Sequence, residues 1–283
     1  MSPAGWLAAL GTGLLAGAVS GLVGIGGGAI MVPFLYFFLA SSELAGVALP
    51  ATEQAVIAHA TSLLVIVPIS VRGAWLYHRA GRVDWDAGWR MGLAAVAFAV
   101  LGARVAVAVP GQALKLVFGI FLLAVAVQVL LGRRSVAGLA TVRTGTRTVR
   151  ALLGGALVGF FSALLGVGGG LVAIPVLLYW LHLPMEKVSA TSLAIITFTA
   201  AAGVLTYAVS GQLGGPGGAA VLSYFHLPVA LALAVGALIA VPLGTEAQLR
   251  MPTRYLRYLF AVVFLLLGAR LTVVNLLMLV RGP

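Results

Sequence analysis

The chain has 283 residues, of which 62% are hydrophobic and 8% are charged. Because about a quarter of the residues of a soluble globular domain are charged, this composition excludes that class and indicates an integral membrane protein. The 17 Lys and Arg against 6 Asp and Glu give a net charge of +11, which in such a protein indicates cytoplasmic loops rather than nucleic-acid binding. Long apolar runs favour membrane-spanning helices over a barrel, whose strands alternate apolar and polar residues.

Ten apolar segments follow one another and form two sets of five. They cover residues 6–23, 29–40, 55–77, 90–109, 113–131, 151–165, 171–183, 188–210, 226–249 and 256–280. Between the sets lies a polar stretch with five arginines, residues 132–150. We therefore predict an all-α polytopic membrane protein with a first transmembrane repeat at 1–131, a basic cytoplasmic linker at 132–150 and a second repeat at 151–283.

A glycine-rich stretch between the first and second segments occurs twice. Residues 17–33 (GAVSGLVGIGGGAIMVP) match residues 159–175 (GFFSALLGVGGGLVAIP) at one constant offset, so that Ser20 corresponds to Ser162. The shared glycines are Gly24, Gly26, Gly27, Gly28, Gly166, Gly168, Gly169 and Gly170. Each glycine costs a helix about 1 kcal/mol relative to alanine, so the helices should break here. Close helix packing is the alternative reading, but two breaks at corresponding positions favour the substrate site of a secondary transporter.

The sequence Ala-Thr-Ser-Leu follows each glycine stretch at a similar distance. Its hydroxyls belong to Thr61 and Ser62 in the first repeat and to Thr191 and Ser192 in the second. They could bond back to the preceding turn of their own helices. Alternatively, all four meet near a pseudo-two-fold axis and form an anion-binding site with the free amides at half-helix starts.

Other polar and aromatic residues have two readings each. Arg72 lies well inside the third segment, where an arginine either contacts substrate or extends to the membrane edge. Glu53, Gln54 and His59 form either a proton relay or a solvated mouth. Five aromatic side chains fit a membrane-interface belt, and these are Tyr77, Tyr207, Trp75, Trp85 and Trp89. With no cysteine and no metal-binding histidine spacing, we predict no metal and no cofactor.

The direction of the chain after each glycine stretch decides the topology. Residues 6–40 as one helix would be about 50 Å long, too long for a hydrocarbon core of about 30 Å. If the chain turns back, each repeat has five crossings, the halves are inverted, and twelve basic loop residues face the cytoplasm against three outside. If it does not, each repeat has four crossings, the halves are parallel, and the division is nine to six. The positive-inside rule favours the inverted arrangement, in which the second segment and the sixth or seventh, all short for full crossings, could be tilted or re-entrant.

The doubled G-x-x-G-x-G-G-G-x-x-x-x-P pattern, each copy followed by ATSL and then G-x-x-x-Y, resembles the sulfite exporter TauE/SafE family of membrane permeases. The resemblance covers both repeats. It implies a transporter of small sulfur-containing or organic anions, such as sulfite and sulfonates, that works without ATP. In repeat two, GQLGGPGG stands where many relatives carry a polar, Asp-containing stretch like the GRVDW of repeat one.

We therefore expect a multi-pass secondary transporter of the prokaryotic inner or plasma membrane, with its site where the repeats meet. Its expected partners are a small anion, the lipid bilayer and a coupling ion, either proton or sodium, and no nucleic acid. A channel or a permease for another solute is the alternative. An intramembrane hydrolase would use Ser20 or Ser162 with His59, but a nucleophile should be unique and this serine is duplicated, so no catalytic residue is predicted.

Overall fold

The protein is described by a computed structural model over residues 1–131, 144–212, 221–250, 265–266 and 268–277. This part is helical apart from one two-stranded hairpin. Its elements are α1 (Pro3–Val23), α2 (Gly28–Ala40), α3 (Ser42–Ala45), α4 (Ala51–Arg79), α5 (Trp85–Ala108), α6 (Gly111–Leu131), α7 (Thr144–Leu165), α8 (Gly170–Pro175), the π-helical η1 (Val176–Trp180), α9 (Met185–Gln212), β1 (Val221–Leu222), β2 (Phe225–His226), α10 (Leu227–Arg250) and a last helix, Gly268–Leu277.

This architecture confirms the predicted all-α polytopic membrane fold. Within the described ranges, six helices are long and apolar enough to cross a membrane, namely α1, α4, α5, α7, α9 and α10. Of the segments predicted to be short, residues 29–40 lie in the 13-residue α2 and residues 171–183 include α8 and η1, whereas residues 151–165 belong to the 22-residue α7. Residues 132–143 of the predicted linker, and parts of the predicted segment at 256–280, lie outside the described residues. Residues 144–150, which we assigned to the linker, belong to α7 instead.

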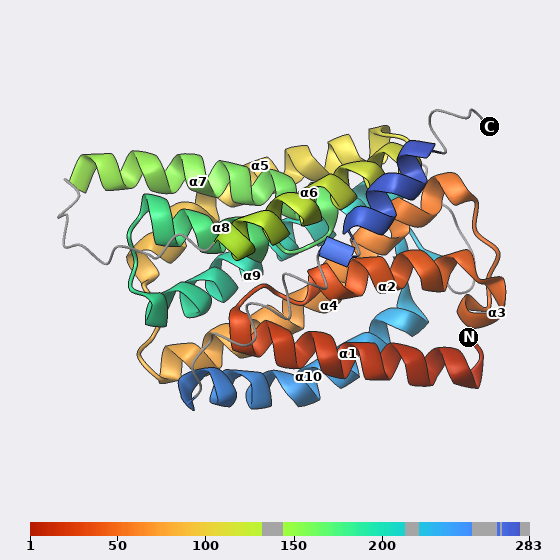
Figure 1. The fold of residues 1–283 in the computed structure, drawn as a ribbon, viewed down its shortest axis with the longest axis horizontal. Coiled ribbons are helices and arrows are strands. Elements are labelled where there is room, and N and C mark those ends of the chain that lie inside the picture. The colour runs from red at the N-terminus through yellow and green to blue at the C-terminus, as the bar shows by residue number, and fades with distance from the viewer. Residues whose placement is uncertain (132–143, 213–220, 251–264, 267, 278–283) are drawn as a thin grey trace.

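The glycine stretches end one helix and begin another. Gly24 ends α1 in the left-handed region at a φ of 79°, and Gly27 precedes α2 at a φ of 80°. A side chain is strained in this region, so the turn needs glycine. In Figure 1, α1 runs away from the N-terminus and α2 runs back, so the chain reverses at this point.

Two pairs of helices pack closely through glycine. Gly13, Gly17 and Gly21 of α1 face Leu233, Ala237 and Val241 of α10, in the same order along both helices, so the two helices are parallel. The corresponding pair in the other half is α7 against α5, where Gly155 and Gly159 face Met91 and Ala95. Small residues let helix backbones approach this closely in membrane proteins.

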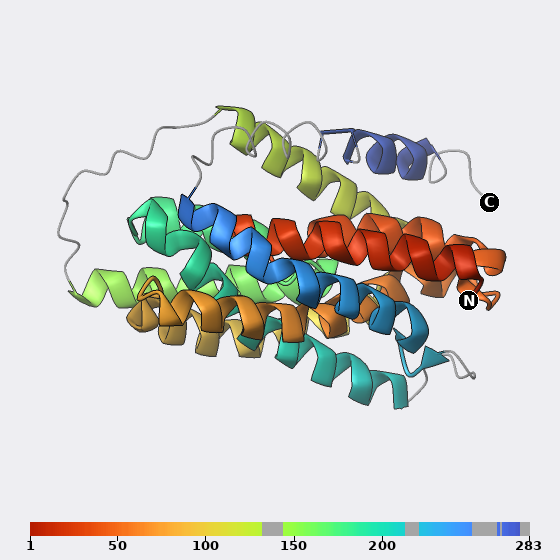
Figure 2. The same cartoon turned by 90° about the horizontal axis from the view of Figure 1, so that it is seen from below.

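Helices α4 and α9 cross in the opposite sense at the centre of the molecule. Gly73 of α4 meets Leu193 of α9, whereas Leu63 meets Gly203, so the sequence order is reversed and the helices are antiparallel. Figures 1 and 2 show the same reversal for α1 and α7, which run in opposite directions. In these two pairs of corresponding helices, α4 with α9 and α1 with α7, the members run in opposite directions.

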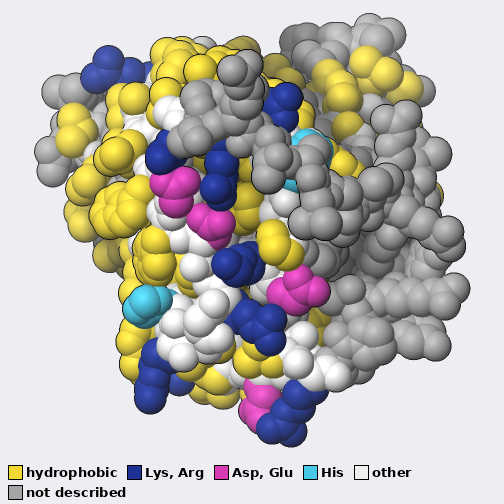
Figure 3. Space-filling model, turned by 90° about the vertical axis from the view of Figure 1, so that its left-hand side faces the viewer, with side chains coloured by type: hydrophobic (Ala, Val, Ile, Leu, Met, Phe, Trp, Pro, Cys, Tyr) yellow, Lys and Arg dark blue, Asp and Glu magenta, His cyan; other side chains and the backbone are white. Residues whose placement is uncertain are grey.

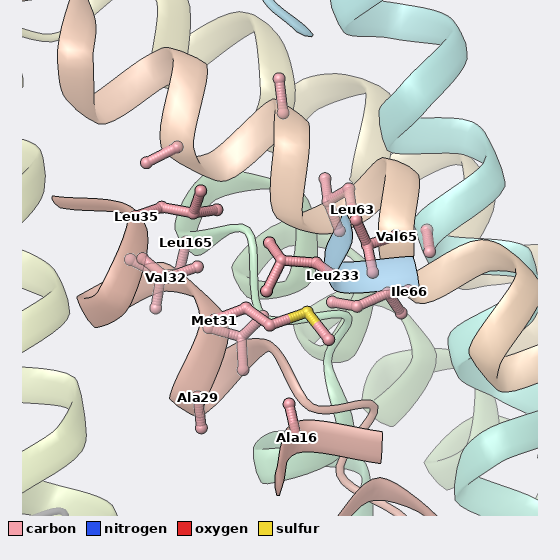
Figure 4. Packing of buried hydrophobic residues seen from close by; sticks show 14 of the residues in the cluster. Ala16, Ala29, Met31, Val32, Leu35, Leu63, Val65, Ile66, Leu165 and Leu233 are labelled. Atoms are coloured by element: carbon pink, nitrogen blue, oxygen red, sulfur yellow. The ribbon is translucent and has the colours of Figure 1, made fainter. Parts of the chain in front are cut away.

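The apolar core lies around this crossing. Met31 and Leu35 of α2 are fully buried, and so are Leu63 and Ile66 of α4. Figure 4 shows these side chains together with Leu165, the last residue of α7. The core thus joins the helix that follows the first glycine stretch to the end of the helix that precedes the second.

Charged side chains gather at one end of the bundle, which we call the basic end. Its described cations are Arg79, Arg82, Arg90, Arg147, Arg150, Lys187 and Arg250. Figure 3 looks onto this end and shows acidic side chains among the basic ones. Arg147 pairs with Asp84 at 3.1 Å and Arg90 pairs with Asp86 at 2.7 Å. These pairs are partly exposed, so each contributes little to stability. At the opposite end, the described cations are Arg104, Lys115 and Arg270.

Substitutions of the helix-packing glycines should separate close packing from simple helix propensity. A Cβ at Gly17 would lie 2.3 Å from the carbonyl oxygen of Ala237, and one at Gly159 would lie 2.1 Å from that of Ala95. We expect Gly17→Ala and Gly159→Ala each to lower the free energy of unfolding by roughly 1–3 kcal/mol. Gly11→Ala is the matched control, because nothing lies within 4 Å of its added Cβ. Denaturation in detergent micelles measures this, and equal losses at all three positions would contradict the packing account.

Candidate functional site

The two glycine loops, residues 24–28 and 166–170, pack directly against each other. A Cβ at Gly28 would lie 2.5 Å from the Cα of Val167, and a Cβ at Gly170 would lie 2.5 Å from the Cα of Ile25. Gly26 and Gly168 both contact Ile66 and Ile196, which mark the crossing of α4 and α9. The structure therefore brings together all eight glycines that the sequence singled out.

Carbonyl groups released at the helix breaks are hydrogen-bonded by side chains. The Tyr77 hydroxyl donates to the carbonyl of Gly21 at 2.6 Å, near the end of α1, and Tyr207 donates to Ala163 at 2.8 Å, near the end of α7. These two tyrosines correspond in the repeats, as do their acceptors. Tyr77 and Tyr207 are fully buried, so our assignment of them to an interface belt is wrong, whereas Trp75, Trp85 and Trp89 are exposed as a belt requires.

Two further hydroxyls act on the loops themselves. Ser192 donates to the carbonyl of Gly24 at 2.8 Å, and Thr199 donates to that of Gly168 at 2.9 Å. Both side chains are fully buried and come from α9. The acceptors left over by the broken helices are thus largely satisfied inside the protein, as backbone at membrane depth requires.

The backbone amides at the same helix breaks, unlike the carbonyls, lack hydrogen-bond partners among the described residues. Neither α2 nor α8 has a side chain that caps its first turn. Across the described ranges, no group accepts a hydrogen bond from the amides of Gly28 and Ala29, or from those of Gly170 and Leu171. Unpaired amides and the positive end of the helix dipole both favour an anion.

Three serine hydroxyls near these loops are buried and have no hydrogen-bond partner in the described part of the chain. They are the duplicated pair Ser20 and Ser162, together with Ser62. Ser62 corresponds to Ser192, whose hydroxyl does have a partner. A buried hydroxyl that is left unpaired costs stability, so these three are available to a polar ligand.

Thr61 and Thr191 do not meet, which corrects our expectation for the four hydroxyls. Thr61 accepts a hydrogen bond from the amide of His226 at 3.0 Å, just before α10, and Thr191 accepts one from the amide of Asp84 at 3.0 Å, just before α5. Thr61 lies five residues before Ile66 and Thr191 five residues before Ile196, the two residues that mark the α4–α9 crossing. Because the helices are antiparallel, the two threonines lie on opposite sides of the crossing, roughly 15 Å apart along the helix axes at 1.5 Å per residue. Their hydroxyls therefore fix the chain at the residues that precede α10 and α5.

Arg72 lies on the exposed face of α4, next to the exposed Val71. Of its two readings, this exposure favours an arginine that extends to the membrane edge over one that contacts a substrate at the glycine loops. The cost of placing an arginine in hydrocarbon explains why its side chain extends along the surface.

His59 is a residue that the sequence suggested as a member of a proton relay or of a solvated mouth, or as the partner of a serine in a hydrolase. Its Nε2 pairs with the hydroxyl of Tyr36, not with Glu53 or Gln54, so that relay is not formed. Gln54 instead donates to the carbonyl of Leu49 at 3.1 Å. The spacing of Tyr36 and His59 in sequence gives no sign of this pairing.

An apolar groove of about 880 Å³ opens elsewhere, between α1, α4, α9 and α10. Pro68, Leu205 and Leu231 are among its lining residues. Phe198 corresponds to Pro68 in the second repeat, and its ring lies 5.0 Å from that of Trp89. Because the groove offers almost no polar atoms, it does not suit a small anion.

Comparison with known proteins gives the following. The family model described as "Sulfite exporter TauE/SafE" matches residues 9–271. The chain is 27% identical over 274 residues to "Probable membrane transporter protein YunE" of Bacillus subtilis, covering 92% of this chain and 94% of that protein. It is 26% identical over 260 residues to a probable membrane transporter protein of Methanocaldococcus jannaschii, covering 90% and 91% respectively. No solved structure matches the chain.

Replacement of the two threonines tests their structural role. Thr61→Val and Thr191→Val keep the side-chain shape but leave the amides of His226 and Asp84 without their acceptor. We expect each variant to lose about 1–3 kcal/mol of unfolding free energy, measured by denaturation in detergent. Thr206→Val is the matched control, since the Thr206 hydroxyl donates only to the carbonyl of Ala202 in its own helix. Unchanged stability with weakened anion binding would instead return Thr61 and Thr191 to the substrate site.

Proposed function

Because this chain belongs to the sulfite exporter TauE/SafE family, we propose that it is a secondary transporter of small sulfur-containing or organic anions, sulfite and sulfonates among them. The relatives named as probable membrane transporter proteins support the transport role. The proposed site is the pair of glycine loops, with Ser20, Ser62 and Ser162 around it. Its location between two duplicated halves is typical of secondary transporters.

One observation carries the choice of an anion. At the helix breaks the carbonyls are paired by Tyr77, Tyr207, Ser192 and Thr199, whereas the amides that begin α2 and α8 are unpaired among the described residues. A cation site would use the carbonyls and would need carboxylates. All six Asp and Glu residues of the chain lie near helix ends, away from the loops. Amide and hydroxyl donors without a fixed charge are suited to an oxyanion.

The opposite directions of corresponding helices support inverted repeats as part of this proposal. In a transporter built from inverted repeats, movement of one repeat opens the site to one side of the membrane. The equivalent movement of the other repeat opens it to the opposite side. The gathering of basic residues at one end supports a cytoplasmic location for that end, by the positive-inside rule. No ATP-binding loop enters this account, so the anion moves down its own gradient or with a coupled ion.

The transport proposal predicts saturable exchange of small anions. Purified protein in liposomes loaded with unlabelled sulfite or methanesulfonate should take up the labelled anion by counterflow, which a carrier performs and a channel does not. The same anions should raise stability by about 2.7 kcal/mol at a hundredfold excess over the dissociation constant. Ser62→Ala should weaken this stabilisation while leaving the stability of the free protein nearly unchanged, because its hydroxyl has no partner to lose. Neither flux nor stabilisation across a panel of sulfur oxyanions, sulfonates and carboxylates would refute the proposal.

The inverted topology predicts the accessibility of single cysteines, for which the cysteine-free chain is a clean background. Arg82→Cys lies at the basic end and Ser42→Cys at the opposite end, and both positions are exposed. In intact cells, a membrane-impermeant thiol reagent should label Ser42→Cys and spare Arg82→Cys. After the cells are opened, both should react. The reverse pattern would place the basic end outside and contradict the assignment.

A further inference from the structure

His59 is the one buried histidine of the described chain with an unpaired ring nitrogen. It is fully buried in α4, its Nε2 pairs with the Tyr36 hydroxyl, and its Nδ1 has no hydrogen-bond partner there. His226, by contrast, is buried with both nitrogens engaged, by the amide of Val229 at 3.3 Å and the carbonyl of Ala45 at 3.2 Å. Burial lowers the pKa of His226, which acts as a structural neutral group before α10.

The surroundings of His59 are aromatic, with one cation. Phe118 of α6 lies 6.2 Å from the His59 ring and 5.9 Å from the Tyr36 ring. Lys115, also on α6 and half-buried, has its Nζ 5.5 Å from the centre of the Tyr36 ring. The other ionisable group that acts on the pair is Tyr207 of α9, and from α7 the ring is faced by the backbone of Leu164. No carboxylate in the described part forms an ion pair with His59 or Lys115.

The hydrogen-bonded pair of Tyr36 and His59 connects the two glycine loops. A Cβ at Gly166 would lie 2.5 Å from the Cα of His59, so the histidine packs on the second loop. Tyr36 belongs to α2, which begins at the first loop. The corresponding residue in the second repeat is Ser189, which packs on Gly24 in the same way but cannot take up a proton. The titratable group is therefore present on one side only of an otherwise duplicated arrangement.

We propose that His59 is a proton-binding site coupled to the anion at the glycine loops, so that proton and anion bind together; this inference rests on the function proposed above. A charged imidazolium without a counter-ion is costly in this pocket, and so is an anion without a counter-charge at membrane depth. Each ligand therefore favours the binding of the other, and this coupling is reciprocal. A proton and a monovalent anion bound together carry no net charge across the membrane. Protonation adds a donor at Nδ1, on the side where the Leu164 backbone lies.

Transport driven by a pH gradient tests the coupling. Methanesulfonate is a suitable probe because its charge does not change near neutral pH. With the outside of the liposomes one pH unit more acidic than the inside, the wild type should accumulate the labelled anion up to about tenfold. His59→Gln, which can still bond to Tyr36 but cannot be protonated, should not accumulate the anion in response to the pH gradient, and its counterflow should need a higher anion concentration because no proton favours anion binding. His78→Gln is the matched control, since His78 is exposed and bonds to Trp85, and it should accumulate like the wild type.

The outcomes separate this inference from the transport function. Counterflow without pH-driven accumulation in the wild type, accumulation only when the inside is acidic, or unchanged accumulation in His59→Gln would each overturn the proton site while leaving the transporter intact. Absence of counterflow with sulfite, methanesulfonate or any other panel anion would instead refute the transport function. Tyr36→Phe provides a second variant if His59→Gln does not fold, and it should reduce the accumulation because it removes the one side-chain hydrogen bond that His59 makes within the described residues.

A spectroscopic measurement decides the proton site without any transport. In protein labelled with ¹⁵N-histidine and held in lipid nanodiscs, only four histidines contribute signals. The signal that shifts in Tyr36→Phe identifies His59, and with saturating methanesulfonate present it should titrate reversibly between about pH 4 and 8. A His59 ring that stays neutral over this range would overturn the proposal, whatever the flux experiments show.

Discussion

The structure depends on one constraint, which is that backbone groups released from a helix at membrane depth must find partners inside the protein. The glycine loops release such groups twice. Tyr77 and Tyr207 satisfy the carbonyls at the ends of α1 and α7, and Ser192 and Thr199 satisfy those of the loops. The loops can therefore lie in an apolar core without being strands or helices, and the donors that remain unpaired define what kind of ligand suits them.

The same constraint explains the close helix pairs. For Tyr77 to reach Gly21, α4 must lie against the end of α1, and the packing of α1 on α10 through Gly13, Gly17 and Gly21 keeps α1 in place. The pair α7 and α5 does the same for the second loop. Each loop is thus held by helices from both repeats, although Tyr77, Tyr207 and Thr199 each donate to a carbonyl of their own repeat and only Ser192 donates to the other one.

Duplication does not make the two halves chemically equal. His59 corresponds to Ser189, and Pro68 corresponds to Phe198. The first difference places a histidine beside one loop only, and in the second Pro68 lines the apolar groove whereas the ring of Phe198 packs against that of Trp89. These unmatched positions are where the two halves of the duplicated scaffold differ in their chemistry.

The sequence by itself determined the class, the helical segments and the glycine breaks, because hydropathy, repetition and helix propensity are local properties of the chain. It also brought out the duplicated hydroxyls, but not their partners. Whether Thr61 bonds to a substrate or to the amide of His226, and whether Tyr77 lies at an interface or under α1, depends on residues more than fifty positions away. Arg72 and Tyr77 lie only five residues apart on one helix, yet one is exposed and the other buried. Only the tertiary structure decided these partners and exposures. The periodicity of a helix indicates which residues share a face, but not which neighbouring helix covers that face.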